Sequence, residues 1–291
     1  MSPTGTSLGG GRTSVSGLLI VLPAILILAS LVGATVILAR YSLNTWRVET
    51  GMVATWSLAN YEAVLSDPVV HKSFLATFRV SAVVTIICIL LGYPAAYAIK
   101  LSKHRSLLVF LVISPMLIDV VVRYYAWILL LGQNGFVNFV FGSLGLWPAP
   151  KRLLYNEISV AIGMIHEFVP LMVLPILNVL ERIDPSVQEA AMSLRAGPIR
   201  TFFRITLPLS LPGVVAGTLL TFALSTSAFV APLILGGGRV TTLTILMQQN
   251  MFTTLNWPMG ATESLLLVAV VMLLLMLYRR QLSTPVKHAG K

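Results

Sequence analysis

Five polar or aromatic side chains gather in one apolar stretch of the sequence and could act on a charged solute. Asp119 and Arg123 stand four residues apart, so they share one face of a helix, where an acid that precedes a base can form an ion pair. Arg123 is followed by Tyr124, Tyr125 and Trp127, which suit a membrane interface or a pathway for cations. The cluster predicts either the lining of a transport pathway or an ion pair that merely orients its helix near the outer face.

Two further groups of polar side chains stand inside apolar stretches. Burying ionisable groups in hydrocarbon costs several kcal/mol unless they pair or face water, so His166 and Glu167 are expected to touch a passing solute or to hydrogen-bond between helices. Ser225 and Thr226 are small and polar, which suits pore lining and close helix packing equally. All four are candidates for the substrate pathway.

The sequence holds no motif for catalysis, nucleotide binding or metal binding. The Gly-rich run that ends in Arg239 lacks the Gly-Lys-Ser/Thr of a phosphate loop. His166-Glu167 begins like a zinc-protease motif, but Pro170 stands where the second histidine belongs. We therefore expect no enzyme activity, no ATP site, no metal and no cofactor in this chain.

One polar loop carries the sequence signals of folded structure. Asp184 can cap a helix whose first residue is Pro185, and Gly197-Pro198 is expected to end that helix. Small and apolar residues recur between them at helical spacing, namely Val187, Ala190, Ala191 and Leu194. A second helical turn is expected over 199–206. A capped helix with a small-residue face predicts a docking element for another protein within residues 184–206.

The composition indicates the class of protein in which these polar side chains lie. Of 291 residues, 56% are hydrophobic and 10% are charged, against roughly 25% charged in soluble domains, which excludes a soluble enzyme or a nucleic-acid-binding protein. Apolar runs of about 20 residues can cross a bilayer as helices. Six such runs are predicted at Gly17–Leu38, Phe74–Ile99, Leu107–Leu131, Ile158–Leu180, Leu209–Leu235 and Ser264–Tyr278. Prolines in four of the five runs after the first indicate kinked helices packed around a pathway.

The charged residues between the runs predict the orientation. Most of the loop Lys and Arg residues fall on one side if both termini are cytoplasmic, as the positive-inside rule requires. Residues 1–16 and 281–291 are predicted to be flexible cytoplasmic tails around a six-helix transmembrane domain at 17–280. The single cysteine, Cys88, is predicted to be a small buried hydrophobe.

The polar loop resembles the EAA motif of integral membrane permeases of binding-protein-dependent ABC importers. The match is carried by Glu189, Ala190 and Ala191, followed at the expected spacing by residues that lead into the next span, namely Ile205, Leu207 and Pro208. In that family the motif forms a cytoplasmic coupling helix that sits in a groove of the ATPase. Arg195 stands where the family usually has glycine, with Gly197 two residues later, so a different helix exit is expected here.

The resemblance covers residues 57–280 and extends to the spermidine/putrescine branch of these permeases. It is carried by Gly92–Tyr97, Arg123–Trp127, Gly132–Gly135, Ala228–Pro232 and Leu235–Gly238. It implies an all-α membrane protein of six transmembrane helices with the type I ABC importer permease fold, in a bacterial cytoplasmic (inner) membrane. It also implies a second homologous permease, two ATPase subunits that hold ATP and Mg, and an extracytoplasmic solute-binding protein. A polyamine is the expected substrate.

Other functions stay open at this point. Related importers for iron(III), sulfate, opines and aminophosphonates share much of the pattern. A secondary carrier driven by an ion gradient would also have broken spans and buried carboxylates, but nothing in that mechanism requires a capped cytoplasmic helix. An assembly or scaffold membrane protein would explain the docking helix without the kinked spans.

Overall fold

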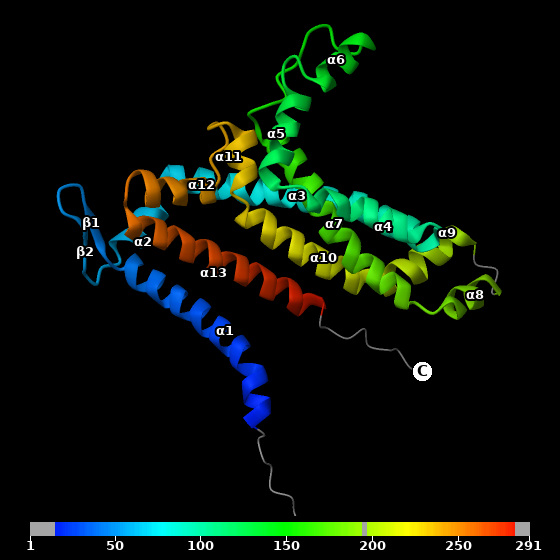
Figure 1. Ribbon diagram of the computed structural model, residues 1–291, viewed down its shortest axis with the longest axis horizontal. Coiled ribbons are helices and arrows are strands. Elements are labelled where there is room, and N and C mark those ends of the chain that lie inside the picture. The colour runs from blue at the N-terminus through cyan, green and yellow to red at the C-terminus, as the bar shows by residue number, and fades with distance from the viewer. Residues whose placement is uncertain (1–14, 194–196, 283–291) are drawn as a thin grey trace, which may run out of the picture.

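The computed structural model describes residues 15–193 and 197–282, and it is almost entirely helical (Figure 1). In chain order the elements are α1 (Val15–Ser42), β1 (Thr45–Arg47), β2 (Gly51–Val53), α2 (Ala59–Ser66), α3 (Pro68–Leu101), α4 (Arg105–Ile113), η1 (Ser114–Leu117), α5 (Val120–Leu131), α6 (Phe136–Ser143), α7 (Glu157–Arg182), α8 (Pro185–Ser193), α9 (Pro198–Thr201), η2 (Phe202–Thr206), α10 (Leu207–Ser227), α11 (Val230–Gly236), α12 (Leu243–Gln248), η3 (Gln249–Thr253) and α13 (Trp257–Leu282). The predicted tails 1–16 and 281–291 lie almost wholly outside the described residues.

Five helical segments of the described chain are long and apolar enough to cross a bilayer. They are Val21–Ser42, Pro68–Leu101, Glu157–Glu181, Pro198–Ser227 and Trp257–Met276. The segments Arg105–Leu117 and Val120–Ser143 pass the same test only as a pair bent by 94°, and they make a sixth crossing if counted as one broken span. The span expected over 107–131 is therefore broken, and by more than a kink, because the chain turns at Ile118, whose backbone is extended.

Two other predicted spans have different ends. The fifth helix stops at Ser227 because Ala228 is extended, and 230–236 form the separate short helix α11, so the span expected over 209–235 is too long. Left-handed Gly237 (φ +53°) terminates α11. The last helix begins at Trp257, seven residues before the expected Ser264.

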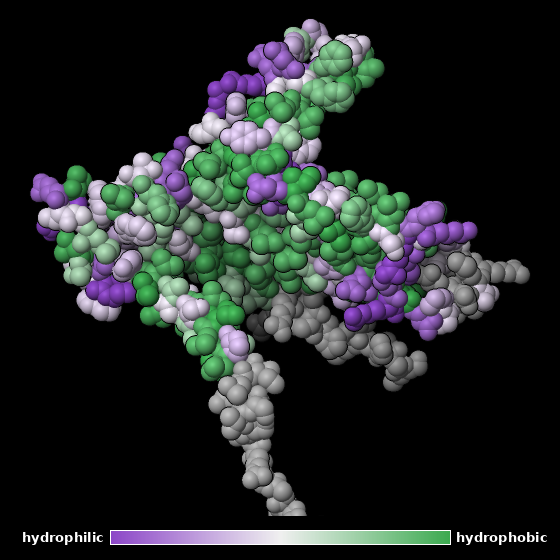
Figure 2. Space-filling view, viewed as in Figure 1, coloured by the Kyte–Doolittle hydropathy of each residue, from purple (hydrophilic) through white to green (hydrophobic). Residues whose placement is uncertain are grey.

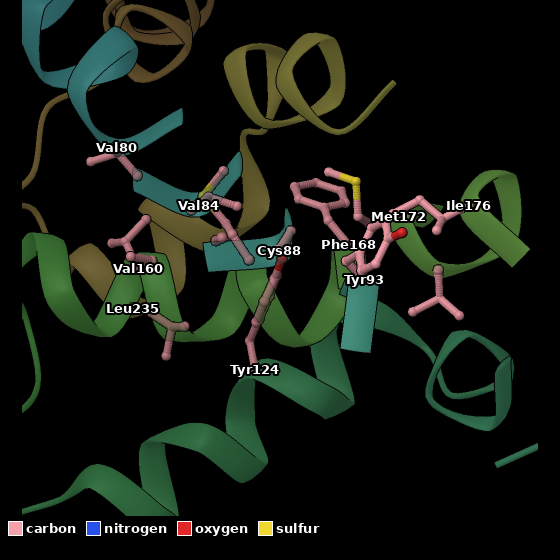
Figure 3. Close-up of a cluster of buried hydrophobic side chains, with 14 of the residues drawn as sticks. Val80, Val84, Cys88, Tyr93, Tyr124, Val160, Phe168, Met172, Ile176 and Leu235 are labelled. Carbon is pink, nitrogen blue, oxygen red and sulfur yellow. The ribbon is translucent and has the colours of Figure 1, made fainter. Parts of the chain in front are cut away.

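The core lies where α3, α7 and α10 pack together. Met172 of α7 is fully buried between two glycines, Gly92 of α3 and Gly217 of α10. A Cβ on either glycine would stand 2.8 or 2.7 Å from Met172, so small residues are what allow these backbones to approach. Cys88 belongs to the same buried cluster, as predicted (Figure 3).

Helix α1 leaves this bundle and packs mainly on α13 (Figure 1). Its apolar side chains are exposed along most of its length; Leu26, Leu31 and Val36 each expose about 60%. Figure 2 shows broad apolar surface over the long helices, with hydrophilic residues concentrated at the ends. This distribution is typical of a protein whose long helices face lipid.

Two ion pairs between helices mark the two ends of the bundle. Arg79 of α3 pairs with Glu157, the first residue of α7, and Arg105 of α4 pairs with Glu181 near the end of α7 at 2.5 Å. The second pair lies beside α8, and we call that side the α8 end. The other side carries the β1–β2 hairpin and α2, and we call it the hairpin end (Figure 1). Helix α1 ends and α13 begins beside the hairpin end, and both run away from it (Figure 1).

Candidate functional site

The predicted docking element is present as two short helices at the α8 end. Asp184 Oδ1 accepts a hydrogen bond from the backbone N–H of Ser186 at 2.9 Å, and Pro185 is the first residue of α8, as predicted. That backbone donor lowers the pKa of the exposed Asp184 carboxyl below its usual value, because it stabilises the charged form.

The predicted coupling residues divide between α8 and the segment that follows. Glu189 and Ala190 fall within α8, and Ala191 is buried. Leu194 and Arg195 lie outside the described residues. The described part of α8 runs to Ser193, and Gly197, whose backbone is extended, directly precedes Pro198 at the start of α9; its carbonyl accepts from the Thr201 N–H at 3.0 Å.

The segment from α9 to α10 is one continuous helix containing a five-residue π-helical stretch, η2, at 202–206. The stretch ends beside three predicted coupling residues: Ile205 and Leu207 are half-buried and Pro208 is exposed. The π-helical geometry marks a place where a helix departs from regular winding, which is frequent at functional positions.

An aromatic contact that was not predicted from the sequence joins this segment to α3. Phe202 meets Tyr93 and Tyr97 edge-on, with ring centroids 5.7 and 5.2 Å apart. The Tyr93 hydroxyl and Ser210 Oγ lie 2.8 Å apart in a buried hydrogen bond. Since Tyr93 and Tyr97 are one helical turn apart, their spacing was the available signal. The contact joins the segment that follows α8 to the core helix α3.

The second predicted site lies in the middle of the bundle, where the chain breaks between η1 and α5. Asp119 was expected to pair with Arg123, but it caps α5 instead: its Oδ1 accepts from the N–H groups of Val121 and Val122 at 2.9 and 3.3 Å. The cap explains why a new helix begins here after the bend. The prediction of an Asp119–Arg123 pair is therefore wrong.

Arg123 turns inward to two acceptors from other elements. Its guanidinium donates to the carbonyl of Pro115 at 2.7 Å, an acceptor in the short 3₁₀ helix η1 at the break. It also lies 3.7 Å from a carboxylate oxygen of Glu167 on α7. The Glu167 carboxylate accepts a hydrogen bond from the Tyr124 hydroxyl. The Arg123 side chain is 7% exposed and that of Glu167 24%. The site is thus a nearly buried ion pair held by a tyrosine.

A cavity lies near this ion pair: Pro115 and His166 are in its lining, whereas Arg123 and Glu167 are not. It measures about 430 Å³, and apart from Trp127 and His166 its lining is apolar, from α3, α4 and α7, with Pro115 at the break. The Trp127 Nε1–H donates to His166 Nδ1 at 3.4 Å. Tyr124 reaches from α5 into the buried cluster (Figure 3), whereas Tyr125 is 59% exposed and points away. The structure thus brings together Arg123, Tyr124, Trp127, His166 and Glu167 and leaves Tyr125 and Asp119 outside.

The depth of this cluster follows from helix geometry. Glu167 is ten residues from Glu157 and fourteen from Glu181, which are about 15 and 21 Å along α7. The two bracketing ion pairs stand at the ends of the apolar region, so the Arg123–Glu167 pair lies near the bilayer midplane. Charged groups at this depth are rare and generally serve a pathway or a relay.

Ser225 and Thr226 lie apart, on α10. Both are buried; Thr226 Oγ1 donates to the carbonyl of Phe222 at 2.8 Å, and Ser225 Oγ has no hydrogen-bond partner in the described chain. Thr221, one turn earlier than Ser225, also has a buried hydroxyl without a partner there. These two hydroxyls form a short polar row on one face of α10.

A capped helix pair at one end and a charged cluster at the midplane of a broken bundle define a membrane transport subunit. Residues 77–283 match the family model of binding-protein-dependent transport system inner membrane components. The chain belongs to this family, and it is a multi-pass membrane protein with the permease fold of ABC importers.

Individual relatives agree with this assignment. The spermidine/putrescine transport system permease protein PotB of Haemophilus influenzae is 34% identical over 218 residues, which are 74% of this chain and 76% of that protein. The structure is similar to a bacterial ABC transporter involved in the import of the acidic polysaccharide alginate, with a TM-score of 0.77, 13% identity and coverage of 92% and 94%. An alginate ABC transporter in complex with a periplasmic protein matches at a TM-score of 0.68, with 14% identity and coverage of 77% and 82%.

Proposed function

We propose that this chain forms half of the transmembrane pathway for a polyamine, spermidine or putrescine. The observation that carries the proposal is the partly exposed Glu167 carboxylate within the apolar length of α7, next in sequence to His166, which lines a cavity of about 430 Å³. An alkyl polyamine combines ammonium groups, which a carboxylate and aromatic faces attract, with methylene segments that suit the apolar lining. The similarity to spermidine/putrescine permeases supports the same substrate class.

The Arg123–Glu167 pair gives this pathway a specific mechanism. Arg123 neutralises Glu167 when the site is empty, and at 3.7 Å the contact is longer than a normal hydrogen bond. An arriving ammonium group replaces the Arg123 guanidinium at the Glu167 carboxylate. The Glu167 carboxylate is then paired in both states, and in the occupied state the Arg123 guanidinium retains only its hydrogen bond to the Pro115 carbonyl.

Energy for the cycle comes from outside the chain in this proposal. Two ATPase subunits hold ATP and Mg, and this chain binds no cofactor, since its sequence has no phosphate loop. The residues of α8, Glu189 above all, dock on one ATPase at the cytoplasmic side. A second homologous permease supplies the other half of the pathway, and an extracytoplasmic binding protein delivers the substrate. Closure of the ATPases moves α8, and Phe202 passes the movement to α3.

The test is ATP hydrolysis and uptake by the reconstituted complex, assembled from this chain, its second permease, the ATPase and the binding protein. Spermidine- or putrescine-loaded binding protein should stimulate both activities. Stimulation by iron(III), sulfate, opine or aminophosphonate instead would keep the importer and overturn the polyamine. If no ATPase copurifies with the chain, the coupling role of α8 is refuted.

A further inference from the structure

A groove at the hairpin end carries an unbalanced positive charge. It measures about 430 Å³ and lies between the start of α3, the start of α7 and the connection from α11 to α12. Its charged lining residues are Lys72, Arg79, Glu157 and Arg239, and Ser73 and Thr241 add polar groups. Three cations thus face one carboxylate.

The single carboxylate is already engaged. Glu157 pairs with Arg79. Neither Lys72 nor Arg239 has an ion pair within the described chain, and both side chains are exposed. Two positive charges therefore remain available to a negatively charged partner from outside.

The distance of the groove from the hydrocarbon core of the membrane limits which partner can reach it. Residues 80–99 of α3 contain no charged side chain, and their twenty residues span about 30 Å, the thickness of the hydrocarbon core. Arg79 therefore stands at the membrane boundary. Lys72 is seven residues further out, about 10 Å along the helix, whereas the headgroup layer is only about 5 to 8 Å deep. The groove thus rises beyond the lipid to the level at which another protein docks.

We propose that this groove receives acidic side chains of the solute-binding protein when that protein docks on the hairpin end. The inference rests on the proposed function, because it takes the hairpin end to be extracytoplasmic. Carboxylates of the partner would pair with Lys72 and Arg239, while Arg79 and Glu157 keep the groove walls together. A polycationic substrate is repelled by the same charges, so the groove is a docking surface and lies outside the polyamine route.

The experiment measures the affinity of substrate-loaded binding protein for the complete complex in lipid nanodiscs. Lys72→Glu and Arg239→Glu are combined in one permease variant. The matched control reverses Arg47 of the hairpin and Lys151 of the connection between α6 and α7, two basic residues that lie outside the groove. All four side chains are exposed, and Lys72→Gln with Arg239→Gln provides a milder pair if the reversed variant does not assemble.

We expect the groove variant to weaken binding about tenfold, mainly through slower association, with the control within about twofold of wild type. Raising salt should weaken wild-type binding and have a smaller effect on the groove variant. Unchanged affinity, or an equal loss in the control, would overturn the groove as the docking site. An effect seen only in nanodiscs of anionic lipid would assign it to headgroups instead. If the wild-type complex binds no polyamine-loaded binding protein at all, the proposed function is refuted. That result differs from unchanged affinity in the groove variant, which refutes only the docking site.

Discussion

Neutralising Glu167 is the most direct perturbation of the midplane cluster. At 3.7 Å and an effective dielectric constant of about 20, the Arg123–Glu167 attraction is about 4.5 kcal/mol before desolvation is counted. Glu167→Gln removes it and leaves a nearly buried guanidinium with the Pro115 carbonyl. Breaking a fully buried pair costs about 3 to 5 kcal/mol, and we expect about 2 here because the Glu167 side chain is 24% exposed.

Stability alone does not separate a structural pair from a substrate site, so the assay uses a double-variant cycle. Thermal unfolding and polyamine uptake are measured on reconstituted complexes carrying Glu167→Gln, Arg123→Gln and both together. The double variant has no unpaired charge, and we expect it to recover most of the lost stability. Uptake should stay at least about tenfold below wild type, because the carboxylate that meets the ammonium group is gone.

Two results would refute this reasoning. If Glu167→Gln transports polyamine normally, Glu167 does not meet the substrate. If the double variant restores uptake together with stability, the pair only holds α5 against α7. Tyr124→Phe is the matched control, since it removes one hydrogen bond to Glu167 and leaves both charges in place; we expect a smaller loss of uptake.

Three further predictions concern the coupling element and the core. Glu189→Lys should abolish ATP-driven uptake while the permease pair still assembles; unaltered uptake in an assembled complex would exclude Glu189 from coupling. Gly217→Ala places a Cβ 2.7 Å from the Met172 sulfur and should destabilise the bundle by about 1 to 3 kcal/mol, with partial recovery in Gly217→Ala/Met172→Ala; an unchanged melting temperature would contradict the packing. The lowered pKa of Asp184 means that its stabilisation of α8 is present at neutral pH and is lost as pH falls through that pKa; hydrogen exchange of α8 should show this in wild type and not in Asp184→Asn.

The sequence predicted the parts of this fold that depend on local signals. Hydropathy located the membrane-crossing segments, and Asp184-Pro185 located the start of α8 because a cap and a first-turn proline act within a few residues. The ends of α10 and α13 were misplaced. Apolar residues continue past Ser227 without interruption, so hydropathy does not register the backbone turn at Ala228.

The sequence predicted which residues belong to the midplane site, but the predicted ion pair within it was wrong. Spacing of four residues favoured Asp119 with Arg123, but that argument requires one uninterrupted helix. The break after η1 makes Asp119 the cap of a new helix and frees Arg123 to reach across to α7. A contact between residues 44 positions apart depends on how α5 packs, which a local pattern does not contain.

The bracketing pairs Arg79–Glu157 and Arg105–Glu181 also make the protein sensitive to the bilayer around it. They hold charged groups at both ends of a fixed apolar length, so a thicker membrane would draw these groups toward hydrocarbon and a thinner one would leave apolar helix surface in water. The bundle can answer such hydrophobic mismatch by tilting, and tilt changes how α8 meets its neighbours. Acyl-chain length is therefore a variable that any reconstitution of this permease must match.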